Sequence, residues 1–229
     1  MKEEILKATD LTREYRIGNT MERIVDDVSL SVAKGEFVVI SGKSGSGKTT
    51  LLSLLSGLER PTEGRVFIGG RDITDLSEDD LGVIRNRSTG FVFQSFHLIP
   101  SLSALENIMF PADLKGDRDG RAKGEKLLRK VDLWERRSHF PDQLSGGEKQ
   151  RVAICRALIN EPDIIFADEP TGNLDSENSK IVIDLLTELY REQTTSLVMA
   201  THSKEIAAMA DRILYLHDGR LQREQDGGA

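Results

Sequence analysis

The amino-acid sequence predicts an α/β fold in which a largely parallel sheet is joined by crossover helices. Short apolar runs rich in β-branched residues recur between turn residues: Arg65–Ile68, Phe91–Phe93, Ile164–Ala167 and Ser196–Thr201. Such runs are typical of strands buried on both faces. Helical patterns lie between them. For example, Ile181, Leu185 and Leu189 recur at the spacing of one helix face. A third observation is a glycine-rich loop between an apolar strand and a leucine-rich helix.

The composition fits a globular domain of this class. The chain has 229 residues, of which 38% are hydrophobic and 30% charged, which suits one domain or one domain with a subdomain. A formal net charge of −7 argues against a nucleic-acid-binding protein that uses a basic face. The single cysteine, Cys155, excludes an internal disulfide and fits a reducing compartment. We expect it to be a small buried residue.

No membrane-spanning or secretory segment is expected. The start, Met1–Thr12, contains acids and no apolar core, unlike a signal peptide. No apolar run approaches the roughly 18 residues needed to cross a bilayer. A function at a membrane would therefore need another subunit as the anchor.

The glycine-rich loop follows an expected strand, Phe37–Ser41, and precedes a helix. It matches the phosphate-binding pattern G-x-x-x-x-G-K-[ST] at Gly42, Gly47, Lys48 and Thr49, in which backbone N–H groups and the helix N-terminus surround phosphates. We expect Lys48 to reach the β- and γ-phosphates and the Thr49 hydroxyl to bind Mg²⁺. The alternative is a flexible turn, which the flanking strand and helix disfavour. The expected nucleotide-binding loop comprises Gly42, Lys43, Ser44, Gly45, Ser46, Gly47, Lys48, Thr49 and Thr50.

The segment Ser101–Gln143 is polar, helix-prone and poor in strand signals, which indicates a helical subdomain inserted into the sheet domain. We expect its Trp134 and Phe140 to pack in a core; the alternative is that they line a groove for a partner. Directly after it, Ser145 is a plausible N-cap of a helix that runs to Leu158. A second anion site at a helix N-terminus makes sense in this chain if it faces the nucleotide held by another copy.

The run Ile164–Ala167 ends in two acids, Asp168 and Glu169. A carboxylate at this strand end could bind Mg²⁺, and a second could orient or deprotonate water. The alternative is two exposed acids with no such role, which the longer string Pro162–Asp175 disfavours.

Together, these motifs resemble those of the ATPase subunits of ATP-binding cassette (ABC) transporters over nearly the whole chain. In order, they are Walker A at Gly42–Thr49, a Q-loop at Gln94, the LSGG signature at Leu144–Gly147, Walker B at Ile164–Glu169, a D-loop at Asn173–Asp175 and a switch histidine at His202. The segments "FVFQSFHLIPSLSALENI" and "FADEPTGNLD" are similar to those of the lipoprotein-releasing and macrolide-exporter branch of this family. Many members of the family have Gln at the position of Glu148. A hydrogen bond donated by a Gln amide is therefore not expected from this position.

The resemblance implies a P-loop NTPase (RecA-like) core with an N-terminal antiparallel β-subdomain and an inserted helical subdomain. It implies one ABC ATPase domain over residues 1–229, with a core at about 1–94 and 160–229 and a helical subdomain at 95–159. It also implies two partners and no nucleic acid. One partner is a second copy, whose Ser145, Gly146 and Gly147 complete each ATP site. The other is an integral membrane permease, which places the chain peripherally at the cytoplasmic face of the inner membrane.

The resemblance also implies a role for each site residue. Tyr15 stacks on adenine, although it could simply pack at the end of the first strand. Gln94 senses Mg²⁺ or the attacking water, although it could be a polar residue leaving a strand. His202 hydrogen-bonds the γ-phosphate, Glu169 is the base, and Lys48 stabilises charge. The residues expected to bind Mg²⁺ are Thr49, Gln94 and Asp168.

Three functions remain open at this point. The chain could energise transport or extraction of lipids, lipoproteins or amphiphilic drugs, or it could move a transmembrane partner that regulates an extracytoplasmic enzyme or sensor without transport. A soluble DNA-repair or translation ATPase is disfavoured, because such proteins usually carry tandem cassettes, coiled coils or zinc cysteines. We expect the membrane partner to contact Ser95–Phe110, where Phe96 and Leu98 would be exposed. Alternatively, these side chains cover the join between the subdomains.

Overall fold

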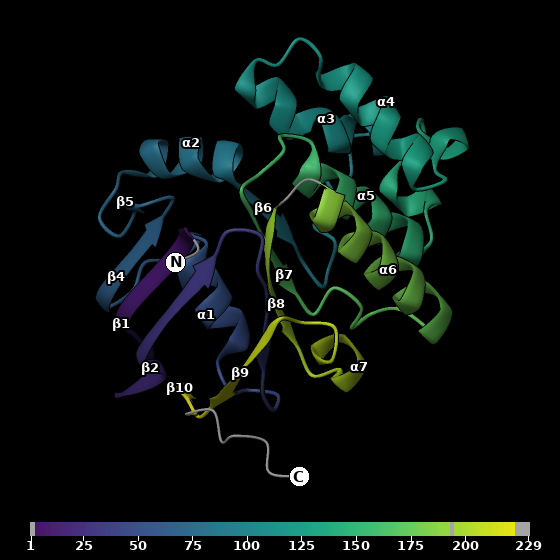
Figure 1. The fold of residues 1–229 in the computed structure, drawn as a ribbon. Helices are drawn as coiled ribbons and strands as arrows, with labels where there is room; N and C mark the ends of the chain where they lie inside the picture. The colour runs from purple at the N-terminus through teal and green to yellow at the C-terminus, as the bar shows by residue number, and fades with distance from the viewer. Residues whose placement is uncertain (1–2, 193–194, 223–229) are drawn as a thin grey trace. The chain divides into compact units, whose positions relative to one another are not determined.

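The structure is a computed structural model, and it describes residues 3–192 and 195–222. The chain divides into two units. One runs to Gly82 and resumes at Ser196, and the other is Val83–Thr195. Helix α2 (Glu78–Ser88) spans the boundary in sequence. Figure 1 labels most of the helices and strands of both units.

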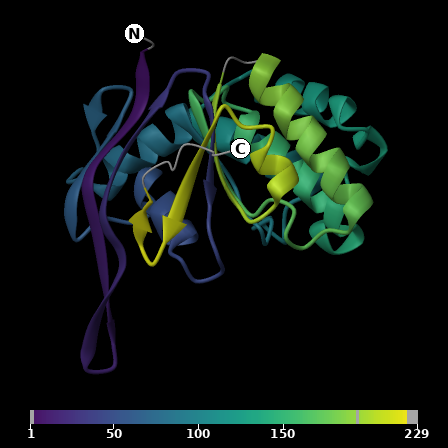
Figure 2. The same ribbon diagram turned by 60° about the horizontal axis from the view of Figure 1, so that its bottom comes forward.

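The first unit contains an antiparallel sheet in the order β2-β1-β4-β5. Its strands are β1 (Glu4–Ile17), β2 (Thr20–Ala33), β4 (Glu63–Ile68) and β5 (Arg71–Asp72). Figure 2 shows β1 and β2 as one long purple hairpin. The prediction that Arg65–Ile68 belongs to the parallel sheet is wrong, because this run forms β4. Val66 and Ile68 are buried whereas Arg65 is exposed, which is the alternation of a strand with one solvated face.

The same unit contains three adjacent parallel strands. Strand β3 (Phe37–Ser41) pairs in parallel with β8 (Ser196–Thr201) on one side and with β9 (Arg212–His217) on the other. Strand β10 (Arg220–Leu221) pairs antiparallel with β9. All of β8 and nearly all of β3 are buried, which explains their unbroken apolar sequence. Helix α1 (Lys48–Leu55) begins after the glycine-rich loop, and α7 (Lys204–Ala207) follows β8.

The second unit combines two parallel strands with a set of helices. Strand β6 (Thr89–Val92) pairs in parallel with β7 (Ile164–Asp168). The helical elements are α3 (Ala104–Lys115), α4 (Gly120–Lys130), the 3-10 turns η1 (Trp134–Arg136) and η2 (Pro141–Gln143), α5 (Gly146–Leu158) and α6 (Ser176–Glu192). The segment predicted to be helical is therefore helical, and it lies between β6 and β7 in the chain.

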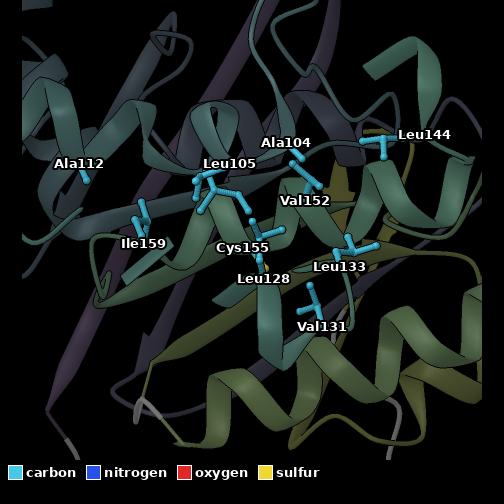
Figure 3. Packing of buried hydrophobic residues seen from close by; sticks show 11 residues of the cluster. Ala104, Leu105, Ala112, Leu128, Val131, Leu133, Leu144, Val152, Cys155 and Ile159 are labelled. Atoms are coloured by element: carbon cyan, nitrogen blue, oxygen red, sulfur yellow. The ribbon is translucent and has the colours of Figure 1, made fainter. Parts of the chain in front are cut away.

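A buried apolar cluster joins α3, α4 and α5. Figure 3 shows Leu105 of α3, Leu128 of α4 and Cys155 of α5 directed toward one another. Burial raises the pKa of the Cys155 thiol to about 12, which confirms the expected inert, apolar role. Leu98 also packs against this cluster, and Ile108 is buried within it. The segment Ser95–Phe110 therefore exposes less apolar surface than predicted.

Two further expectations about packing need correction. Helix α6 buries Val182, Ile183 and Leu186, whereas Ile181 is 43% exposed; its buried stripe therefore starts one residue later than the predicted face. The side chain of Leu189 lies outside the described residues. Phe140 is 44% exposed, so it is not a core residue.

Trp134 is only half-buried, and two arginines lie against its ring. The guanidinium carbons of Arg129 and Arg137 lie 3.4 and 4.5 Å from its ring centroid. These are cation–π contacts. Among the described residues, no helix has the length and apolar character of a membrane span.

Candidate functional site

The glycine-rich loop connects β3 to α1 as a cradle, and two of its glycines leave no room for a larger side chain. A Cβ at Gly42 would collide with the backbone carbonyl of Leu216, and one at Gly47 would lie 2.5 Å from the carbonyl oxygen of Ile24. Gly47 also has φ +98°, a conformation that favours glycine. These two positions explain why the pattern requires glycine on either side of the loop.

Polar groups of the loop converge inside this cradle. Lys48 is buried, and its Nζ donates to the carbonyl oxygens of Gly42 and Lys43 at 3.0 and 3.1 Å. The hydroxyl of Ser46 is buried, and within the described part of the chain it has no hydrogen-bond partner. The tip residues Lys43–Gly45 and Thr49 are exposed. A buried cation, an orphaned hydroxyl and exposed backbone N–H groups beside a helix N-terminus suit a bound polyphosphate.

His202 leaves the sheet at the same edge as the glycine-rich loop. Ser41, the last residue of β3, is level with Thr201, the last residue of β8. His202 follows directly and is exposed. Ser203 fixes the next turn, because its N–H donates to the Thr201 hydroxyl at 3.1 Å and its hydroxyl caps α7. Ligands of open α/β sheets bind at such a carboxyl edge.

Tyr15 lies near the end of β1 in the first unit, opposite Glu22 of β2. It is half-buried, and its hydroxyl donates to both carboxylate oxygens of Glu59, at 2.6 and 2.7 Å. Burial, and then the hydrogen bond to Glu59, raise the pKa of Tyr15 against the opposing hydrogen bonds of Arg13 and Thr50. The phenol is therefore a donor at neutral pH.

In the second unit, the predicted Gln94, Asp168 and Glu169 lie at or just after the ends of neighbouring strands. Val92 of β6 is level with Ala167 of β7, so both strands deliver polar residues to one edge. Gln94 Nε2 donates to Asn173 Oδ1 at 3.4 Å, and Asn173 Nδ2 donates to the Gln94 carbonyl at 3.0 Å. These contacts join the predicted Q-loop to the predicted D-loop.

The two acids differ in their surroundings. Asp168 is the buried last residue of β7. Glu169 is more accessible and has φ +42°, which is uncommon for a residue with a side chain. The turn is closed by the N–H of Gly172, which donates to the Glu169 carbonyl at 2.9 Å. A strained backbone of this kind often marks a functional residue.

Ser145 caps helix α5 as predicted, and Glu148 completes the cap. The Ser145 hydroxyl accepts from the Glu148 N–H at 3.3 Å, and the Glu148 carboxylate accepts from the Ser145 N–H at 2.8 Å. Arg136 lies 3.4 Å from the same carboxylate. Glu148 thus has a structural task of its own, and the S-x-x-E spacing in the sequence could have revealed it. Gly147 faces Asn178 so closely that a Cβ would collide with its amide.

Gln150 is a further residue that the sequence reasoning did not identify. It is fully buried in α5, and its Nε2 donates to the carbonyl of Pro170 at 2.7 Å and to that of Phe93 at 3.4 Å. Because both partners are acceptors, the amide nitrogen must face them. Gln150 therefore fixes the signature helix to the residue before Gln94 and to the residue after Glu169.

The structure thus groups the predicted site residues in two sets. The first unit holds Tyr15, Gly42–Thr50 and His202, and the second holds Gln94, Ser145–Gly147, Asp168 and Glu169. Among the described residues, no group of three or more His, Cys, Asp or Glu side chains could hold a metal ion alone.

Comparison with known proteins gives a consistent result. The family model described as "ABC transporter" matches residues 25–172. A lipoprotein-releasing system ATP-binding protein LolD from Xanthomonas campestris pv. campestris (strain 8004) is 47% identical over 220 residues, which cover 95% of this chain and 92% of that protein. The macrolide export ATP-binding/permease protein MacB of Syntrophobacter fumaroxidans is 43% identical over 96% of this chain, but the match covers only 32% of MacB.

Two solved structures are also similar. The dimeric structure of MJ0796, a bacterial ABC transporter cassette, has a TM-score of 0.89 and 42% identity, and the match covers 95% of this chain and 97% of that one. A dimeric structure of a post-hydrolysis state of the same cassette, bound to ADP and Pi, has a TM-score of 0.89 and 41% identity with the same coverage.

Proposed function

This chain belongs to the ABC transporter family of ATPases, and we propose that it energises the release or export of a lipoprotein, lipid or other amphiphile. The named relatives supply the substrate class, because one is a lipoprotein-releasing system and another is a macrolide exporter. Both are named for moving a substrate, which favours transport over the mechanical regulation of an extracytoplasmic enzyme.

The observation that carries the ATPase function is the cradle between β3 and α1. Its Gly42 and Gly47 leave no room for a Cβ, while Lys48 and the Ser46 hydroxyl are buried inside it. These features fit the phosphates of ATP. Lys48 would leave its carbonyl partners for the β- and γ-phosphates, where a fixed cation stabilises the charge of the transferred phosphoryl group. Tyr15 would stack on the adenine.

Hydrolysis needs a water molecule aligned with the γ-phosphorus. Glu169 is the proposed base: it accepts a proton from water as the new oxygen–phosphorus bond forms and the bond to the ADP oxygen breaks, which gives ADP and Pi. Gln94 would orient this water, and His202 would hydrogen-bond the γ-phosphate. The catalytic contribution is mostly positioning and charge stabilisation.

The residues expected at Mg²⁺ fit that ion. The Thr49 hydroxyl, the Asp168 carboxylate and the Gln94 amide all offer oxygen ligands, which Mg²⁺ prefers together with phosphate oxygens and water. With so few protein ligands, the ion would be bound together with the nucleotide. When bound, it would neutralise charge on the phosphates.

Ser145, Gly146 and Gly147 would contact the ATP held by a second copy. The cap keeps the Ser145 hydroxyl as an acceptor toward Glu148, so its proton stays available to a γ-phosphate oxygen. The N-terminus of α5 adds backbone N–H groups. The dimeric MJ0796 cassette supports an arrangement of two copies.

The second proposed partner is an integral membrane permease, which would hold the chain at the cytoplasmic face of the membrane. The MacB relative is itself an ATP-binding/permease protein. The second unit has a cavity of about 240 Å³ lined by Arg85, Phe91, Phe93, His97 and other residues, and we place the permease contact there. This contact adjoins Gln94, so nucleotide-dependent movement of Gln94 would reach the permease.

The division into a core at about 1–94 and 160–229 and a helical subdomain at 95–159 is part of the same proposal.

Co-purification and reconstitution test this function. The tagged chain should be isolated from solubilised membranes with its integral partner and reconstituted in lipid vesicles that contain a labelled lipoprotein or amphiphile. We expect ATP to drive loss of the label from the vesicles, and Glu169→Gln to prevent it. A complex that hydrolyses ATP but moves no amphiphile would favour the mechanical regulator.

A further inference from the structure

Tyr15 is held by two charged residues. Its hydroxyl donates to both oxygens of the Glu59 carboxylate. The same carboxylate accepts from Arg13 Nε at 3.1 Å and from Nη2 at 2.7 Å. Arg13 and Tyr15 are two positions apart on β1, so their side chains leave the same face of the strand. Phenol, carboxylate and guanidinium therefore form a closed triangle.

The triangle restricts how the Tyr15 ring can be used. The guanidinium carbon of Arg13 lies 4.7 Å from the ring centroid, so it covers one face, and a flat ligand would have to stack on the other. The ion pair between Arg13 and Glu59 is about a quarter exposed on each side and is neutral as a pair. The ring is thus fixed without presenting net charge to a base.

Glu59 is itself fixed to the helix that follows the phosphate loop. Helix α1 ends at Leu55, and Gly57 then turns the chain with φ +69°. The N–H groups of Leu58 and Glu59 both donate to the Ser53 carbonyl, at 2.9 and 3.0 Å. The carboxylate that holds Tyr15 therefore has a fixed place relative to α1, and α1 begins at Lys48.

We propose that Glu59, together with Arg13, is a positioning residue that sets the Tyr15 ring at the adenine distance from the phosphate loop. Tyr15 and Lys48 lie on different elements, and the strand pairing of β1 near Tyr15 is with β2, not with α1. Glu59 connects the two, so that the base and the phosphates of one nucleotide can be held together. This inference rests on the proposed stacking of adenine on Tyr15.

The test compares a ligand that has adenine with one that does not. ADP and inorganic pyrophosphate are titrated calorimetrically against each variant, since neither ligand is hydrolysed here or completes a γ-phosphate site. Glu59→Ala should weaken ADP binding about fivefold, the loss expected for one hydrogen bond, and leave pyrophosphate binding unchanged. A residue with only a structural role would weaken both ligands together.

Two further variants make the result specific. Glu59→Gln keeps an acceptor for the Tyr15 hydroxyl, so it should retain most of the ADP affinity even though it loses the charge opposite Arg13. Tyr15→Phe removes the hydroxyl but keeps the ring, and combining it with Glu59→Ala should cost no more than either change alone. Glu14→Ala is the matched control: Glu14 is next to Tyr15 on β1 but pairs with Arg23, and ADP binding should not change.

The outcomes separate this inference from the function on which it rests. Tyr15→Ala should weaken ADP binding about 5- to 150-fold, the range for one base–aromatic stack. If it has no effect, the adenine role of Tyr15 is wrong. If Tyr15→Ala weakens ADP binding and Glu59→Ala does not, or if Glu59→Ala and Tyr15→Phe are additive, Glu59 is not the positioning residue.

Discussion

Glu169 combines a reactive position with an unusual backbone. Its φ of +42° costs conformational free energy, of order 1–3 kcal/mol, and the residue directly follows the buried strand that ends in Asp168. Two hydrogen bonds hold the turn that follows Glu169: one from the Gly172 N–H to the Glu169 carbonyl and one from Gln150 to the Pro170 carbonyl.

Glu169→Gln should abolish ATP turnover, by about 100-fold or more, and leave ATP binding intact. The amide keeps the shape of the side chain but cannot accept the proton of the attacking water. Phosphate release and nucleotide titration measure the two quantities. Glu161→Gln is the control, because Glu161 also has a positive φ, +55°, but lies outside the site. Near-normal turnover in Glu169→Gln would exclude Glu169 as the base.

Lys48→Ala should weaken MgATP binding about 10- to 150-fold, as expected for loss of a charged hydrogen-bond donor. The variant deletes the buried cation that now holds the Gly42 and Lys43 carbonyls. Lys34→Ala removes an exposed lysine and should have no effect. An unchanged dissociation constant in Lys48→Ala would place the phosphates elsewhere.

At the scale of elements, the N-terminus of α5 depends on the reciprocal cap of Ser145 and Glu148. Burial alone would raise the pKa of Glu148, but the hydrogen bonds from Ser145 and the charges of Arg136 and Arg151 together lower it. The carboxylate is therefore more favourable in the folded chain than in the unfolded one. Its contribution to stability is present above its ordinary pKa of 4.5 and is lost as the pH falls through the lowered value.

Glu148→Ala should lower the free energy of unfolding by about 1 kcal/mol at pH 7, the usual loss for a helix cap. Glu148→Gln should lose less, because a Gln at this position can also accept from the Ser145 N–H. Urea unfolding of both variants, measured from pH 7 to pH 3, gives these losses. The difference in the free energy of unfolding between the native chain and Glu148→Gln should decrease toward pH 3. A difference that does not change with pH would contradict the role of charge.

The cavity beside β6 gives a prediction about the membrane partner. His97 lines it and is exposed, and its ring is tilted against that of Phe93 with ring centroids 4.5 Å apart. His97→Glu should spare MgATP binding but abolish co-purification with the permease. Leu114→Glu changes an apolar residue of the same unit that is 67% exposed and does not line the cavity, so it should keep the complex. Retention of the permease by His97→Glu would move the contact elsewhere.

Contiguous motifs were predictable from the sequence, because their chemistry lies within one turn of chain. Gly42–Thr49 and the Ser145 cap are of this kind. By contrast, Gln150 acts on Phe93 and Pro170, which are 57 and 20 positions away, and no local pattern indicates such a contact. A short apolar run such as Arg65–Ile68 does not specify its partner strand, which is why the sequence predicts the wrong sheet for β4. The spacing of apolar residues in a helix leaves its buried face uncertain by one residue, which is why it predicts a buried Ile181.

For the whole molecule, the fold class follows from the order of apolar runs and helices, and the match to the MJ0796 cassette over 95% of the chain confirms it. The proposed boundaries of the helical subdomain stay a prediction. They depend on contacts among distant segments, which apolar periodicity does not encode. Apolar periodicity also does not encode dimerisation. The proposed ligand of Ser145–Gly147 is the ATP of another copy, which a single chain does not contain.

ATP should drive dimerisation, most strongly in Glu169→Gln, since each proposed site needs the signature of the other copy and hydrolysis no longer resolves it. Sedimentation at high protein concentration, with and without MgATP, measures this. Adding Ser145→Trp to Glu169→Gln should block the dimer by filling the contact. A monomer at saturating MgATP in Glu169→Gln would contradict the shared site.

The burial of Cys155 has a practical consequence. This thiol is the only one in the chain and lies inside the helical cluster, where burial raises its pKa to about 12. Maleimide reagents should therefore not modify it at neutral pH. The natural chain can thus be labelled without first removing a cysteine. One introduced cysteine in each unit would carry a pair of spin or fluorescent labels. The distance between the labels would then follow the two units through the ATP cycle.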